Sequence, residues 1–152
     1  MSEQKKLFLD TEEKQIALVD ELTISSWLLV LEKYIKPLND SYSISVKFVS
    51  SNTMKKLNNQ FLKKNAPTNV LAFPLNSDND PFHSLGDIAI CSELVKREAK
   101  AQYKRVEDHL AHLFIHGVLH LLGYRHSTKS DSKRMEIMEI KILSELGIGN
   151  PY

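Results

Sequence analysis

The stretch VEDHLAHLFIHGVLHLLGYRH, residues 106–126, constrains the fold more than any other part of this sequence. Its apolar residues fall on nearly every side of a helix and leave no broad polar face. Such a helix is typical of the interior of a domain, because a surface helix keeps a polar side for water. The sequence therefore predicts a buried helix with other elements packed around it.

Four histidines interrupt this apolar helix at helical spacing. His116 and His120 are four residues apart, so their rings project from the same face. Gly123 suits the left-handed residue that ends a helix, and His126 follows closely enough to return toward that face. The pattern H-x3-H-x2-G-x2-H suits a three-histidine zinc site with an open coordination position. We expect His116, His120 and His126 to bind one Zn²⁺ per chain.

The other histidines of the helix, His109 and His112, are not expected to be ligands. A lone histidine in an apolar helix is more often a hydrogen-bonded core residue, because a buried imidazole needs a polar partner. We expect His112 to support a ligand from behind.

The histidine spacing resembles that of the zinc helix in metzincin proteases, with one difference that bears on catalysis. In those enzymes a glutamate directly follows the first histidine and acts as general base. Here that position is Gly117, and no Asp or Glu lies between His116 and His126. A peptidase of that mechanism would lack its base, so this is the least favoured function.

Length and composition suit one globular domain over residues 1–152. The chain is long enough to bury a substantial core, and 42% of its residues are hydrophobic and 26% charged. Cys91 is the one cysteine, no apolar run is long enough to span a membrane, and the first residues do not resemble a signal peptide. These features predict a cytoplasmic protein with no membrane partner.

Positive charge is concentrated in the middle of the chain. The net charge is only +1, but residues 41–130 hold 12 basic and 7 acidic side chains. A basic run is usually a solvated face, yet one in the same segment as the histidines favours a polyanionic substrate. Lys63 and Lys64 are candidates for phosphate contact.

Hydrophobic periodicity and turn signals divide the chain into strands and helices. Strands are expected at residues 6–9, 42–49 and 85–90, and helices at 26–35, 51–62, 92–103, 106–122 and 131–146. The segment 66–75 and a polar loop at 76–84 lie before the last of these strands. Because strands and helices interleave, we expect an α+β (mixed α/β) fold. It would have a small mixed sheet of about four strands covered by about five helices, with the zinc site at the end of the buried helix.

Three segments resemble the signatures of one protein family. HGVLHLLGYRH, residues 116–126, resembles almost letter for letter the histidine signature of the YbeY family of bacterial endoribonucleases. PTNVLAFPL, residues 67–75, and LGDIAI, residues 85–90, resemble two further signatures in the same order. The resemblance implies a zinc-binding fold and a cytoplasmic endoribonuclease specific for single strands. It also implies action in ribosomal RNA maturation, notably at the 3′ end of the small-subunit RNA, and in ribosome quality control.

The same resemblance implies partners and shows two departures. The implied partners are single-stranded ribosomal RNA, the small ribosomal subunit and a ribosome-associated small GTPase. Where the family usually has a phosphate-holding arginine this chain has Leu62, and where it has an aspartate before the last histidine this chain has Arg125. Lys63 and Lys64 could replace the missing arginine as point charges, and Arg125 is a candidate to hold an RNA phosphate.

The sequence does not assign two further roles. Asp87, in a mostly apolar strand, is a candidate either to orient a ligand histidine or to cap the turn after the strand. No residue identifies itself as the general base. The leading hypothesis is a zinc-dependent endoribonuclease, and the alternative is a zinc-containing ribosome assembly factor that has lost nuclease activity, which the two departures favour.

Overall fold

The computed structural model describes residues 6–12, 17–35, 42–75 and 84–152, so the expected polar loop lies outside it except for Ser84. The elements of these residues are, in chain order, β1 (Leu7–Thr11), α1 (Glu21–Tyr34), β2 (Ser43–Val49), α2 (Ser51–Leu62), β3 (Val70–Pro74), β4 (Ser84–Cys91), α3 (Ser92–Ala101), α4 (Val106–Leu121) and α5 (Lys129–Glu145). The predicted α+β class is confirmed, with four strands and five helices among the described residues. None of the described helices is long and apolar enough to cross a membrane.

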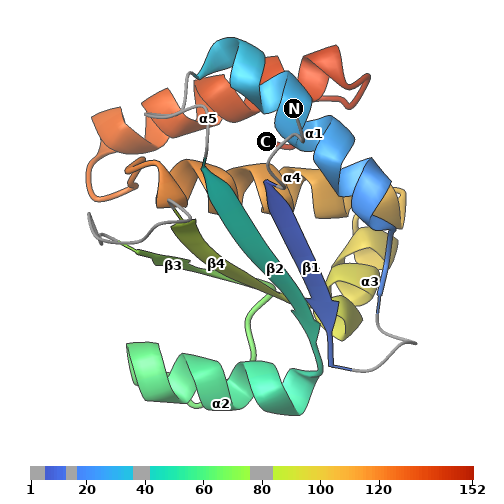
Figure 1. Ribbon diagram of the computed structural model, residues 1–152, viewed down its shortest axis with the longest axis vertical. Helices are drawn as coiled ribbons and strands as arrows, with labels where there is room; N and C mark the ends of the chain where they lie inside the picture. Colours follow the sequence, from blue (N-terminus) through green and yellow to red (C-terminus); the bar gives the residue numbers. More distant parts are fainter. Residues whose placement is uncertain (1–5, 13–16, 36–41, 76–83) are drawn as a thin grey trace, which may run out of the picture.

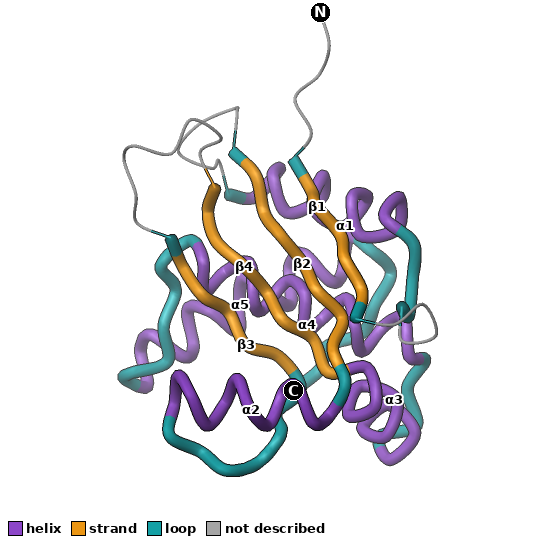
Figure 2. Tube along the Cα trace, turned by 60° about the horizontal axis from the view of Figure 1, so that its bottom comes forward, coloured by secondary structure: helices purple, strands orange, loops and turns teal. Residues whose placement is uncertain are grey.

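The four strands form one mixed sheet in the order β1-β2-β4-β3. Strands β1, β2 and β4 run parallel, and β3 runs antiparallel to β4 at the sheet edge (Figures 1 and 2). The two central strands, β2 and β4, are mostly buried. Such strands need helices on both faces, because a parallel sheet rarely leaves a face in water.

The helices are divided unequally between the two faces of the sheet. Helix α2 lies on one face, whereas α1, α4 and α5 lie on the other (Figure 1). Side chains alternate accordingly along β4: Ile88 and Ile90 belong to the large core with α4, and Ala89 and Cys91 to a smaller core with Met54 of α2. Helix α4, which carries two of the three histidines expected to bind metal, therefore lies on the face of the sheet that three helices cover.

Helix α4 lies at the centre of the large core, which explains its apolar residues on nearly every side. It packs against β3 and β4 of the sheet and against α1, α3 and α5. Gly117 faces the sheet, where a Cβ atom would lie 3.2 Å from Ile88 Cδ1. The helix therefore approaches β4 closely at the turn that carries His116 and His120.

Helix α1 begins at Glu21, five residues before the start at Ser26 that its apolar pattern predicts. Asp20 is the N-cap, and its Oδ1 accepts a hydrogen bond from the Thr23 amide at 2.9 Å. The buried stripe of α1 begins only at Ile24, and Leu22 is 81% exposed, so the residues before Ile24 carry no signal but the capping aspartate.

Candidate metal centre

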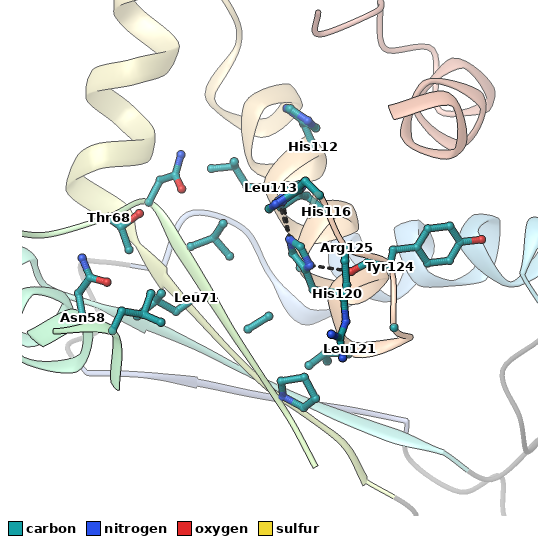
Figure 3. Close-up of a pocket in the computed structure, with 18 of the residues that line it drawn as sticks. Asn58, Thr68, Leu71, His112, Leu113, His116, His120, Leu121, Tyr124 and Arg125 are labelled. Carbon is teal, nitrogen blue, oxygen red and sulfur yellow. Dashed lines mark hydrogen bonds between the residues drawn. The ribbon is translucent and has the colours of Figure 1, made fainter. Parts of the chain in front are cut away.

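Three histidines converge at the C-terminal end of α4. His116 and His120 lie on its last two turns, and His126 lies five residues beyond its end. Their Nε2 atoms are 3.0 Å (His116 to His120), 2.9 Å (His120 to His126) and 3.4 Å (His116 to His126) apart (Figure 3 shows the first pair). The structure thus brings together the three residues that the sequence motif singles out.

Gly123 reverses the chain so that His126 can reach the other two rings. Its φ of +99° is in the left-handed region that glycine adopts without steric cost. The Tyr124 amide then donates to the Leu119 carbonyl at 2.9 Å, which ties the returning chain to the last turn of α4. The same turn places the Tyr124 carbonyl beside His120.

The ring orientation of two of the histidines is fixed from behind. His116 Nδ1 lies 2.5 Å from Glu139 Oε1, and His120 Nδ1 lies 2.9 Å from the Tyr124 carbonyl oxygen. A carboxylate and a carbonyl only accept hydrogen bonds, so both Nδ1 atoms carry the proton. In the neutral rings both Nε2 atoms then hold lone pairs, which face each other at 3.0 Å. Such an arrangement is unfavourable unless a cation lies between them.

The donor set fits a zinc ion. Zn²⁺ binds histidine nitrogen at about 2.0–2.1 Å in tetrahedral sites, which corresponds to nitrogens roughly 3.3 Å apart. The three separations here, 2.9–3.4 Å, are close to that value. Burial, followed by the charge of His116, lowers the pKa of His120, so this ring favours the neutral form that a metal ion needs. His116, His120 and His126 can therefore bind a metal ion.

Glu139 of α5 is the buried anchor of this centre. Its side chain is fully buried, and it accepts hydrogen bonds from His116, from His112 Nε2 at 3.2 Å and from the Tyr152 hydroxyl. Burial acts to raise the pKa of Glu139, but these hydrogen bonds outweigh it and lower the pKa to about 2. The carboxylate therefore stays charged and holds two histidines at once.

Glu139 also takes the role that the sequence offered to Asp87. Asp87 is exposed and lies on the face of the sheet opposite α4, because it alternates with Ile88 along β4. It therefore does not orient a histidine. A signal for Glu139 was present: it lies four residues after Met135 and three before Ile142, which are both buried, so it is a charge on the apolar stripe of its helix. Tyr152 had no comparable signal.

The two remaining histidines of α4 have carboxylate partners. His112 contacts Glu139 and lies one turn before His116, so it supports the centre without belonging to the three converging rings. His109 is buried, and its Nε2 lies 3.0 Å from Glu98 Oε1, which also accepts a hydrogen bond from Asn69 Nδ2. His109 is thus a paired core residue away from the metal centre.

The three histidines line an open pocket of about 660 Å³. Figure 3 shows His112, His116 and His120 along one side of it, with Asn58 and Thr68 on the opposite side. Of the candidates for phosphate contact, Lys64 and Arg125 line this pocket. Lys63, the C-cap of α2 in the left-handed conformation with φ +59°, is exposed and is not among the lining residues. Leu62 lines the pocket and is about half exposed.

Comparison with known proteins agrees with the signatures in the sequence. The profile of the Endoribonuclease YbeY family matches residues 8–147. Endoribonuclease YbeY of Wigglesworthia glossinidia brevipalpis is 45% identical over 141 residues, which cover 91% of this chain and 90% of that protein. Endoribonuclease YbeY of Coxiella burnetii is 43% identical over 130 residues, which cover 85% of this chain and 86% of that protein.

A solved structure is similar as well. The solution structure of TM1509 from Thermotoga maritima superposes with a TM-score of 0.60 at 26% sequence identity, and the match covers 93% of this chain and 91% of that one. The resemblance noted in the sequence is thereby confirmed, and the chain belongs to the YbeY family of endoribonucleases.

Proposed function

We propose that this chain is a zinc-dependent endoribonuclease that hydrolyses single-stranded RNA. The observation that carries the proposal is the convergence of three histidine Nε2 atoms, with no donor of their own on His116 and His120, at the wall of an open pocket. The same pocket is lined by two cationic side chains, Lys64 and Arg125. A metal site beside fixed positive charge suits a phosphodiester substrate.

The residues of the pocket divide the work between binding and positioning. His116, His120 and His126 would hold Zn²⁺, which lowers the pKa of a bound water and polarises a phosphate oxygen. Glu139 holds His116 in the tautomer that presents Nε2. Lys64 and Arg125 would bind the RNA backbone from two different segments, after α2 and after α4. Contacts of this kind position a strand without reading its bases.

The two departures from the family pattern both lie in this pocket. Leu62 places an apolar side chain where the family usually has an arginine, and Lys64, two residues on, supplies a charge in the same pocket. Lysine holds a phosphate as a point charge and lacks the bidentate fork of arginine. Arg125 adds a guanidinium in place of the usual aspartate. We therefore expect phosphate contact to come from Lys64 and Arg125 in this chain.

The proposal extends to the cellular role by family membership. The chain would act in the cytoplasm on ribosomal RNA, notably at the 3′ end of the small-subunit RNA, and in ribosome quality control. The small ribosomal subunit and a ribosome-associated small GTPase would be its partners.

Cleavage of a labelled single-stranded RNA by purified protein tests the proposal, with His120→Ala purified identically as the control. Cutting by the wild type that the variant lacks supports the endoribonuclease. Equal residual cutting by both indicates a contaminating nuclease and removes the support.

A third result would favour the assembly factor. If neither protein cuts RNA while the wild type holds about one zinc ion per chain, the metal centre is present but the catalytic proposal is wrong. Ribosomal RNA processing in cells that carry only His120→Ala would then be normal, because an assembly factor needs the fold and not the metal chemistry.

A further inference from the structure

A second hollow adjoins the metal pocket. It has a volume of about 270 Å³ and is lined by Leu122, Gly123, Tyr124, Arg125, Asp131 and Arg134. Gly123, Tyr124 and Arg125 line the metal pocket as well, so the two hollows meet at the turn that follows α4. An RNA strand that leaves the metal pocket over Arg125 would therefore enter the second hollow without crossing another helix or strand of the protein.

The second hollow carries a net positive charge, because two arginines and one aspartate line it. Arg125 and Arg134 are both exposed, and neither forms an ion pair with a described residue, including Asp131 of the same hollow. Asp131 is also the one acid in the segment YRHSTKSDSKR, residues 124–134, which carries four Lys and Arg residues. Two guanidinium groups without a partner carboxylate, next to a metal centre, form a site for an anion.

We propose that Arg125 and Arg134 bind one phosphate of the RNA. This phosphate neighbours, along the same RNA strand, the phosphate that is held in the metal pocket. The planar guanidinium donates in a fork that matches two oxygens of a phosphodiester, and two such groups can grip one phosphate from two sides. Arg134 comes from α5 and Arg125 from the turn after α4, so the subsite bridges the two elements that build the metal centre. This inference rests on the proposed RNA substrate and adds to it the exit path of the strand.

The test is the salt dependence of RNA binding, with Arg134→Gln compared with Lys133→Gln. Lys133 is the neighbouring exposed cation on the same turn of α5 but does not line either hollow. Both substitutions remove one charge at nearly the same place, so a diffuse field affects them alike. Binding of a short, labelled single-stranded RNA is followed by fluorescence anisotropy at several salt concentrations, and a denaturing gel confirms that the strand is intact after each titration.

If the subsite is real, Arg134→Gln lowers the slope of log K against log salt by about 0.7, the value for one contact to a single strand, and weakens binding roughly tenfold at low salt. Lys133→Gln changes the slope by less than half as much. A neutral methylphosphonate at one linkage of the RNA removes the phosphate charge that Arg134 would contact. It should therefore abolish the difference in salt slope between wild type and Arg134→Gln. Equal effects of the two substitutions, or no effect of Arg134→Gln, overturn the subsite.

The outcomes also separate this inference from the proposed nuclease. RNA that binds with an Arg134-dependent slope but is never cut supports the subsite and contradicts the nuclease. RNA that is cut with equal slopes for both variants supports the nuclease and contradicts the subsite. A wild-type protein that binds no single-stranded RNA overturns both.

Discussion

The buried carboxylate of Glu139 lies 2.5 Å from His116 Nδ1 and joins α5 to the ligand-bearing end of α4. Because the carboxylate accepts this hydrogen bond, the proton of the ring stays on Nδ1 and Nε2 is left to face the other two histidines. The candidate metal centre is thus built from two helices, although its three converging rings all come from residues 116–126.

Replacing Glu139 with glutamine should weaken metal binding by about 10–100-fold, the usual effect of losing the charged partner behind a ligand histidine. Glutamine keeps the length of the side chain and an oxygen acceptor, but it loses the negative charge that favours the metal-bound ring. Competition with a chromophoric chelator measures the change. Glu136→Gln removes the same charge from the same helix, at a position that is only partly buried and does not contact a ligand histidine, so this matched control should change the affinity far less.

Acid should remove a stabilising contribution of Glu139. The pKa of Glu139 in the folded chain is about 2, below its ordinary value of 4.5, so the charged form is the one that favours folding. The contribution is present above pH 4.5 and is lost as the pH falls toward 2, and it amounts to about 3 kcal/mol. Urea unfolding at a series of pH values should show a steeper loss of unfolding free energy for the wild type than for Glu139→Gln. If the unfolding free energies of wild type and Glu139→Gln fall in parallel with pH, the lowered pKa of Glu139 is contradicted.

His112 should prove dispensable for metal stoichiometry and His116 essential. His112 donates to Glu139 and lies outside the three converging nitrogens, whereas His116 supplies one of them. His112→Gln is expected to retain about one metal ion per chain with an affinity reduced several-fold, and His116→Gln to lose the ion. Metal analysis after gel filtration distinguishes the two. If His112→Gln loses the metal ion and His116→Gln keeps it, His112 and not His116 is a metal ligand.

Gly86 should tolerate no side chain. Its φ is +145°, and a Cβ atom would lie 2.3 Å from the Phe73 carbonyl oxygen of β3 and 2.8 Å from Leu121 Cδ2 of α4. Backbone cannot move aside as a flexible side chain can, so Gly86→Ala is expected to destabilise the fold by about 3 kcal/mol or more. Chemical denaturation measures this. Gly149→Ala, where nothing lies within 4 Å of the added atom, should change stability by about 0.5 kcal/mol or less.

Leu62→Arg should strengthen RNA binding. Leu62 lines the metal pocket and is about half exposed, so an arginine there can reach a bound phosphate without burying its charge. The salt slope should increase by about 0.7, and RNA cleavage, if the proposal above holds, should rise. Gln60→Arg adds the same charge to an exposed position of α2 outside the pocket and should have a smaller effect.

The sequence carried most of the information for the ligands and little for what supports them. His116, His120 and Gly123 are local: a helix has fixed spacing, and a left-handed glycine has a predictable effect on the chain that follows. Glu139 is not local, because its place depends on how α5 packs against α4. Its one trace in the sequence is a charge where the stripe of α5 should be apolar.

Asp87 shows the opposite error. An acid in an apolar strand stands out in the sequence, but which face of the sheet it occupies depends on the alternation of its whole strand. Once Ile88 and Ile90 pack under α4, Asp87 must point toward the other face. The start of α1 was likewise hidden, because its buried stripe begins only at Ile24 and the exposed Leu22 does not belong to that stripe.

The two hydrogen bonds by which Glu139 of α5 holds His112 and His116 of α4 have a consequence for local unfolding. When no metal ion holds the ligand histidines in place, their hydrogen bonds to the buried carboxylate of Glu139 weaken. The packing of α5 against α4 is then less stable. Chelation should therefore raise amide hydrogen exchange in α5 and in the turn after α4 well before it affects β2 and β4 at the centre of the sheet. Metal binding would then stabilise the last two helices as one cooperative unfolding unit. The amide exchange rates of these helices would report how much of the protein holds metal.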